Sequence, residues 1–209
     1  MYISGEDEVT KAIIYRIMDY CSPRLKVFKE IPARGGEIKN KIKELNLLSR
    51  AKPVILLTDL DANCCAPVPK DSLLNGVIKN DDFLINIAID EAEAWLMADR
   101  KGFSDYFGIP IESIPTSSMQ KMGGRRQVNE MDFNCKSSWL LTHDYIKKSS
   151  KSELKQQIES TGTATKGKEY NTAILPFIRD AWDIGAAIEN SDSLSRMVKR
   201  LRNLTLKYT

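Results

Sequence analysis

The sequence predicts an α/β protein built on a parallel β-sheet that is flanked by helices. Residues 54–57 form an unbroken aliphatic run, as is typical of a strand that is buried on both faces, and residues 83–89 form a further expected strand. Segments with helical spacing of apolar residues separate the expected strands, which favours βαβ units. Each of three strand ends carries acidic residues, at the edge where open α/β sheets bind ligands.

The first hundred residues alternate strands and helices. Acidic residues follow the first strand and suit the first turn of a helix, which Cys21-Ser22-Pro23 then ends. The paired glycines 35–36 indicate a loop with unusual backbone angles. The expected strands are 1–4, 25–28, 54–57 and 83–89, and the expected helices are 6–20, 37–50, 71–77 and 92–98.

In the second half, the alternation of expected strands and helices is weaker, and the chain is rich in lysine and arginine from Lys147 onward. Residues 122–134 are interpreted as a flexible basic segment around a Gly-Gly-Arg-Arg run. We therefore divide the chain into an α/β core over 1–100 and a mostly helical, basic C-terminal extension over 101–209 that packs on the core. The helices expected in this extension are 139–148, 152–159, 174–182 and 191–204, the last capped by Ser191 or Ser193.

Composition narrows the protein class. No apolar run approaches the roughly 18 residues of a membrane span, so we expect a cytoplasmic protein without membrane association. The net charge of +3 does not by itself imply nucleic acid. The four cysteines are not spaced like a zinc site and are expected to be free thiols. No P-loop or G-x-G-x-x-G occurs, so nucleotide hydrolysis by this chain is not expected.

The acids at the strand ends are the candidate catalytic residues. Asp59 and Asp61 are two apart, so their side chains would point to the same side of a strand. Because parallel strands end at one edge, acids after three strands would gather there, and oxygen-only ligands suit Mg²⁺ or Mn²⁺. The alternative is a solvated loop after a core strand. The candidates are Glu6, Glu8, Asp59, Asp61, Glu91 and Glu93.

Basic residues are the candidates for phosphate or nucleic-acid binding. Magnesium at carboxylates commonly acts on phosphate substrates, whose charge basic side chains neutralise. The alternative for each residue alone is a solvated surface charge. These candidates are Arg34, Lys121, Arg125, Arg126, Lys166 and Lys168.

Five segments together carry a family resemblance. They are Glu6-Asp7-Glu8, Arg34-Gly35-Gly36, Leu57-Thr58-Asp59-Leu60-Asp61, the run EAEAWLMAD at 91–99, and Gly167-Lys168-Glu169-Tyr170-Asn171. In this order they resemble a Toprim domain, as found in the OLD-type (overcoming lysogenization defect) nucleases and in small uncharacterised bacterial proteins encoded beside phage-defence genes. In the OLD-type register, Ser4 stands where the leading Glu belongs and Glu8 matches the second acid.

The resemblance implies a Mg²⁺-dependent nuclease that cleaves phosphodiester bonds in phage defence, with an ABC- or OLD-type ATPase partner. Glu8, Asp59 and Asp61 would hold the metal, and Glu6, Glu91 and Glu93 would be further ligands or would position water. Ser4 favours an alternative, a non-catalytic Toprim-like subunit that binds nucleic acid or the partner. Phosphoryl or nucleotidyl transfer to a small molecule is a third reading, and the basic tail argues against it.

Overall fold

The computed structural model describes residues 1–33, 37–59, 74, 76–122, 126–164 and 166–208. Four parallel strands form the main sheet in the order β2-β1-β3-β4. Their bounds are β1 (Tyr2–Gly5), β2 (Lys29–Glu30), β3 (Val54–Asp59) and β4 (Phe83–Ala88). The predicted α/β class with a parallel sheet flanked by helices is therefore confirmed.

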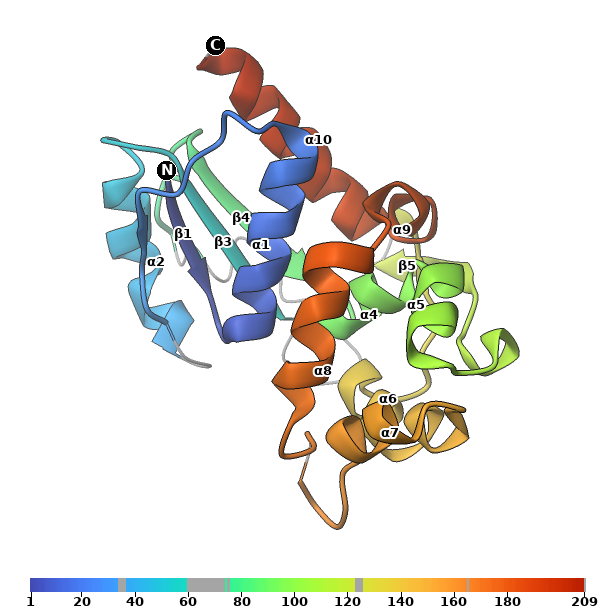
Figure 1. The fold of residues 1–209 in the computed structure, drawn as a ribbon. Coiled ribbons are helices and arrows are strands. Elements are labelled where there is room, and N and C mark those ends of the chain that lie inside the picture. Colours follow the sequence, from blue (N-terminus) through green and yellow to red (C-terminus); the bar gives the residue numbers. More distant parts are fainter. Residues whose placement is uncertain (34–36, 60–73, 75, 123–125, 165, 209) are drawn as a thin grey trace.

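Both faces of β3 are buried, as its unbroken apolar sequence predicts. Val54 and Leu56 pack in a cluster with the apolar face of α2 (Glu37–Leu48). Ile55 and Leu57 point to the other face and join a larger cluster, in which α1 (Glu8–Cys21) takes part. Figure 1 shows α2 on one side of the sheet and α1 on the other. Each fully buried aliphatic side chain contributes about 1.5–3 kcal/mol to this packing.

The second strand is shorter and later than predicted. Residues 25–28 were expected to form it, but the ladder with β1 covers only Lys29 and Glu30. Leu25 and Val27 instead pack against the larger core cluster, so their alternation reflects core packing rather than a ladder. The Phe28 N–H donates to the Met1 carbonyl at 2.7 Å, just before β2 begins.

The segment 122–134, interpreted as flexible and basic, contains the second strand of an antiparallel hairpin. β5 (Ser117–Met122) pairs with β6 (Arg126–Met131), and the residues between them lie outside the described part of the chain. Val128 and Met131 are buried, yet polar residues surround them, so the sequence lacks the alternation that marks a hairpin. The interpretation of 122–134 as a flexible segment was wrong for β6.

Helices of the second half follow the prediction in part. The expected helix 139–148 is divided at Asp144 into α6 (Ser137–His143) and a 3₁₀ turn, η2 (Tyr145–Lys148). The helix expected at 152–159 is α7 (Ser152–Ile158). Ser191 caps α10 (Asp192–Lys207) by accepting from the Leu194 N–H. The other elements with described bounds are α4 (Ala92–Met97), α5 (Arg100–Phe107), η1 (Ile111–Ser113), α8 (Tyr170–Pro176), the π-helical turn η3 (Phe177–Ala181) and α9 (Ile184–Asn190).

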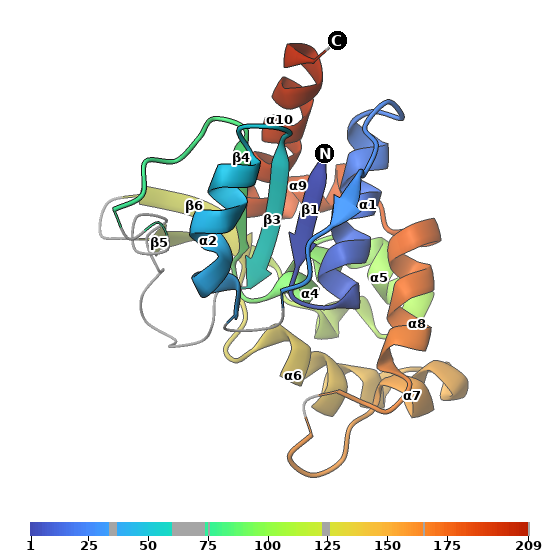
Figure 2. The same ribbon diagram turned by 90° about the vertical axis from the view of Figure 1, so that its left-hand side faces the viewer.

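One buried cluster contains side chains from both halves of the chain, among them Ile14, Trp95, Phe177 and Leu201. Figure 2 shows α10 beside the sheet and α6 and α7 below the ends of its strands. Trp139, in contrast, is 42% exposed and stacks on His143. Across the described residues, no helix combines the length and apolarity that spanning a bilayer requires.

Candidate functional site

Carboxylates gather where β1, β3 and β4 end. Glu6 follows β1, Asp59 ends β3, and Glu91 and Glu93 follow β4. β1 and β3 are paired neighbours up to Gly5 and Leu57, which places the residues that follow them side by side. The charges of Glu93, Glu6 and Glu91 all act on Asp59. The structure thus brings together four of the acids that were predicted as candidates.

Asp59 is the buried centre of this acidic cluster. Its backbone N–H donates to Glu6 Oε1 at 3.1 Å, and the Thr58 hydroxyl donates to the same oxygen. Its own Oδ1 is buried and has no hydrogen-bond partner among the described residues. Burial, followed by the charges of the neighbouring acids, raises the pKa of Asp59 well above its usual value. Asp61, the second predicted acid of this strand end, lies outside the described residues.

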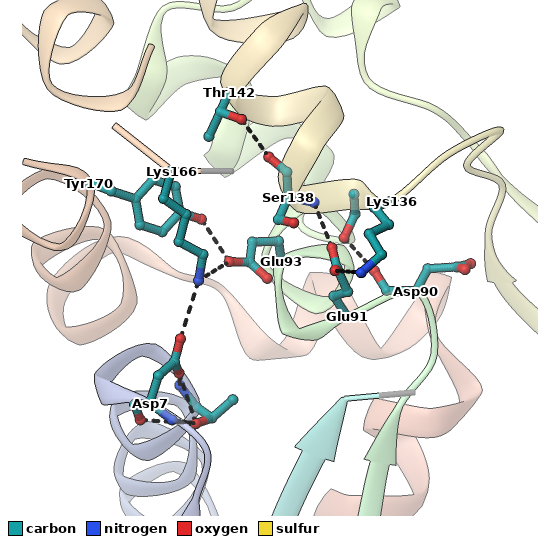
Figure 3. A network of polar contacts seen from close by, with 11 residues as sticks. Asp7, Asp90, Glu91, Glu93, Lys136, Ser138, Thr142, Lys166 and Tyr170 are labelled. Atoms are coloured by element: carbon teal, nitrogen blue, oxygen red, sulfur yellow. Dashed lines mark hydrogen bonds and ion pairs between the residues drawn. The ribbon is translucent and has the colours of Figure 1, made fainter. Parts of the chain in front are cut away.

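Lys166 joins two acids of the cluster (Figure 3). Its Nζ lies 3.2 Å from Asp7 Oδ2 and 3.0 Å from Glu93 Oε1. The Tyr170 hydroxyl donates to the same Glu93 oxygen at 2.8 Å. Burial disfavours the charged form of Lys166, but the charges of Glu93 and Asp7 outweigh that effect, so its pKa is raised. Burial alone would raise the pKa of Asp7. The charge of Lys166 and the hydrogen bonds with Thr10 outweigh that effect, so the pKa of Asp7 lies below its usual value.

Local sequence explains why Asp7 and Lys166 meet. Asp7 is the N-cap of α1 and forms a capping box with Thr10, which fixes its position at the end of β1. Gly167 packs against the end of α7, where an added Cβ would lie 2.6 Å from the Gln157 carbonyl oxygen and 2.7 Å from that of Ile158. Only glycine fits so close to these carbonyls, and the preceding Lys166 is thereby held near the acids.

The turn after β4 is strained. Asp90 and Glu91 have φ angles of 57° and 74°, which are uncommon for residues other than glycine. The start of α6 holds this turn in place. The Ser138 N–H donates to Glu91 Oε2 at 2.9 Å, Lys136 Nζ lies 3.7 Å from Glu91 Oε1, and the Ser137 hydroxyl donates to the Asp90 carbonyl. Burial, with the charges of Glu91 and Asp132, raises the pKa of Asp90 to about 6.

Glu8, which was predicted as a metal ligand, does not lie with Asp59. Its side chain is 63% exposed and pairs with Lys11, which also contacts Glu30. Successive residues of an α-helix point about 100° apart. Asp7 at the cap therefore turns toward the cluster while Glu8 in the first turn points to solvent.

The predicted basic residues lie in different places. Lys166 is in the cluster, and Lys168 lines the same polar cleft of about 530 Å³ as Lys166. Lys121 is exposed on β5, and Arg126 begins β6. Arg34 and Arg125 lie outside the described residues.

Several polar residues of the site were not among the predicted candidates, and the most important of them are Asp7, Lys136, Ser138 and Tyr170. The cap signal of Asp7 followed by Thr10 could have identified the first of them. Tyr170 stands in the segment 167–171 that contributed to the family resemblance, and its hydroxyl contact required the structure. Nothing in the sequence near Lys136 and Ser138 indicates their contact with Glu91.

The donor set is chemically suited to a hard cation such as Mg²⁺, because it is made of carboxylate oxygens and includes the unpartnered Asp59 Oδ1. Within the described residues, however, no three His, Cys, Asp or Glu side chains converge closely enough to hold a metal ion. The residues therefore fit the ion by ligand type, with Asp59 and Glu6 as the side chains best placed to hold it.

Comparisons with known proteins do not identify this site. No family model, curated protein or solved structure matches the chain.

Proposed function

We propose that this protein is a Toprim-like, Mg²⁺- or Mn²⁺-dependent nuclease that cleaves phosphodiester bonds in the cytoplasm, in phage defence and with an ABC- or OLD-type ATPase partner. The observation that carries the proposal is Asp59, a buried carboxylate with an unpartnered oxygen among other acids. Burying a charge without a partner is costly, and like charges nearby add to that cost. A divalent cation at this oxygen would offset both effects.

The first strand supports this proposal. Ser4, which stands where the resemblance expects a leading Glu, is buried within the sheet, and its hydroxyl donates to the Ile31 carbonyl at 3.1 Å. Glu6 accepts the Asp59 N–H and so lies at the strand end beside Asp59. We therefore assign the role of the leading acid to Glu6.

The residues of the chain have distinct roles in this proposal. Asp59 and Glu6 would hold the cation, and Asp61 is the further ligand that the sequence pattern suggests. A bound Mg²⁺ would polarise a phosphoryl oxygen and lower the pKa of a bound water. Lys168, on the cleft beside the cluster, supplies positive charge for a nucleic-acid backbone.

Cleavage of plasmid DNA and of RNA in Mg²⁺ or Mn²⁺ tests the proposal, with the chain alone and co-expressed with its candidate ATPase partner. Asp59→Asn and Asp61→Asn should lower the cleavage rate on the order of 100-fold or more, because stabilisation of transition-state charge is lost. Asp105→Asn is the matched control, since Asp105 is exposed and paired with Lys101. Equal cleavage by wild type and Asp59→Asn, or none by wild type, would contradict the proposal.

One observation favours a second candidate, a non-catalytic subunit that binds nucleic acid or an ATPase. Lys166 already neutralises part of the acidic cluster, and the described acids do not converge into a complete metal-binding set. This candidate predicts that the wild-type chain shifts nucleic acid in gel electrophoresis in the presence of EDTA and cuts nothing when Mg²⁺ is added.

A further inference from the structure

Lys166 carries a positive charge into the acidic cluster from a distant part of the chain. Its ammonium lies between Asp7, at the start of α1, and Glu93, in α4 (Figure 3). Glu93 is buried, with 2% of its surface exposed, so its charge is poorly hydrated and depends on partners inside the protein. Lys166 is therefore a structural counter-ion of these two carboxylates rather than a solvated surface lysine.

The position of this ammonium is fixed by its surroundings. Its Nζ lies 4.9 Å from the centroid of the Tyr170 ring, within the range of a cation–π contact. The close packing of Gly167 against the end of α7 holds the neighbouring backbone. Because these contacts already hold the Lys166 side chain, pairing with the two acids costs little additional conformational entropy.

The spacing at Lys166 suits an ammonium rather than a metal ion. The two carboxylate oxygens lie 3.0 and 3.2 Å from Nζ, which are ordinary N–H···O distances. Mg²⁺ would require its oxygen ligands at about 2.0–2.1 Å, inside the volume that the ammonium now fills. A divalent cation cannot bind between Asp7 and Glu93 while Lys166 is there.

The acidic cluster thus has two differently compensated halves. In one half, Asp7 and Glu93 share the ammonium of Lys166. In the other half, Asp59 retains a buried oxygen that accepts no hydrogen bond from any described residue. The two halves interact, since both Glu93 and Asp7 act electrostatically on Asp59.

We propose that Lys166 is the resident cation of the Asp7–Glu93 half, so that the chain binds one divalent cation fewer than its carboxylates would otherwise accept. This inference rests on the cation site proposed at Asp59. It specifies that site as a single-cation centre in which a lysine takes the second cation's place.

Counting bound Mn²⁺ tests this inference without any measurement of activity. Electron paramagnetic resonance detects free Mn²⁺, so the loss of its signal gives the number of ions bound per chain. Isothermal titration calorimetry gives the same number independently. We expect one ion for wild type and two for Lys166→Met, because the vacated Asp7–Glu93 pair then accepts Mn²⁺. Lys166→Arg keeps the positive charge and should bind as wild type does. Lys101→Met, which removes an exposed lysine that pairs with Asp105, is the control and should also match wild type.

The difference between variant and wild type decides the outcome. If Lys166→Met binds no more Mn²⁺ than wild type, the inference is overturned, whether or not the protein is a nuclease. If wild type binds none and Lys166→Met binds one, the role of Lys166 stands and the proposed cation site at Asp59 fails. A Lys166→Met chain that folds only with Mn²⁺, as seen by circular dichroism, also supports the inference. If it folds under neither condition, the same count is made on Lys166→Gln.

Discussion

Glu130 and Asp59 are both buried carboxylates on strands, but their surroundings are opposite. Glu130, on β6, accepts from the Ser191 hydroxyl at 2.7 Å, from the Ser193 N–H at 2.6 Å and from the Ser193 hydroxyl at 3.0 Å, and Arg196 lies 3.9 Å away. Asp59, on β3, has an oxygen without any partner among the described residues and faces other acids.

The contrast separates an acid with a structural role from one that we propose holds a cation. Burial raises the pKa of both carboxyls, but hydrogen bonds from Ser191 and Ser193 oppose that rise at Glu130, whereas neighbouring acids add to it at Asp59. Glu130 fastens the hairpin to the start of α10, where the helix dipole also favours a negative charge. At Asp59, Oδ1 accepts no hydrogen bond from a described residue, and this uncompensated burial is the reason we propose a cation there.

Removing the satisfied acid should have the largest effect. Glu130→Ala would leave the buried Ser193 N–H without its acceptor and the Ser191 and Ser193 hydroxyls with only each other as acceptors, and should lower the free energy of unfolding by about 3 kcal/mol. Urea denaturation followed by circular dichroism measures this change. Glu112→Ala, at an exposed position in η1, is the control and should change stability by less than about 0.5 kcal/mol. A similar small change for Glu130→Ala would remove the basis of the comparison.

Neutralising the unsatisfied acid should have the opposite sign. Because the pKa of Asp59 is higher in the folded state than in the unfolded chain, its ionisation costs stability once the pH rises above the unfolded value near 3.8. Asp59→Asn should therefore raise the free energy of unfolding of the metal-free protein, by about 1–2 kcal/mol at pH 8. The gain should vanish near pH 3. Denaturation curves at several pH values in EDTA would show it, and destabilisation at pH 8 would mean that Asp59 has a structural partner.

Asp90 offers a smaller, intermediate case. Its pKa rises from 3.8 unfolded to about 6 folded, so ionisation costs stability progressively between about pH 4 and pH 6. Asp90→Asn should gain about 1 kcal/mol above pH 6, a figure reduced for the partial exposure of this side chain. Asparagine tolerates the positive φ at this position, so the turn should be kept. The stability of wild type and variant should converge at pH 4, and parallel curves across this pH range would assign the gain to another cause.

The sequence predicts those parts of the fold in which each residue's neighbours are local or periodic. The run from Val54 is apolar at every position because both faces of β3 are covered, and the strand was recognised for that reason. The β5–β6 hairpin was missed because its stability depends on Glu130 and the distant start of α10 rather than on alternating apolar residues.

The candidate site was predicted to the level of the strand ends and no further. Residue spacing placed Glu6, Asp59, Glu91 and Glu93 at one edge, because parallel strands end together. It could not decide between Asp7 and Glu8, since that choice depends on which residue caps α1. The contact from Lys166 joins positions 159 residues apart along the chain and follows from tertiary packing alone.

The edges of the main sheet have a consequence for how this protein meets others. β4 is an edge strand, and α10 lies beside it, with Arg200 Nη1 donating to the Ile85 carbonyl at 3.0 Å (Figure 2). At the other edge, β2 offers only two residues of ladder. Exposed strand edges are where foreign strands add and where aggregation starts. The helix α10 discourages such addition at β4, and the shortness of β2 discourages it at the other edge. Loss of α10 would therefore expose β4 as a template for self-association.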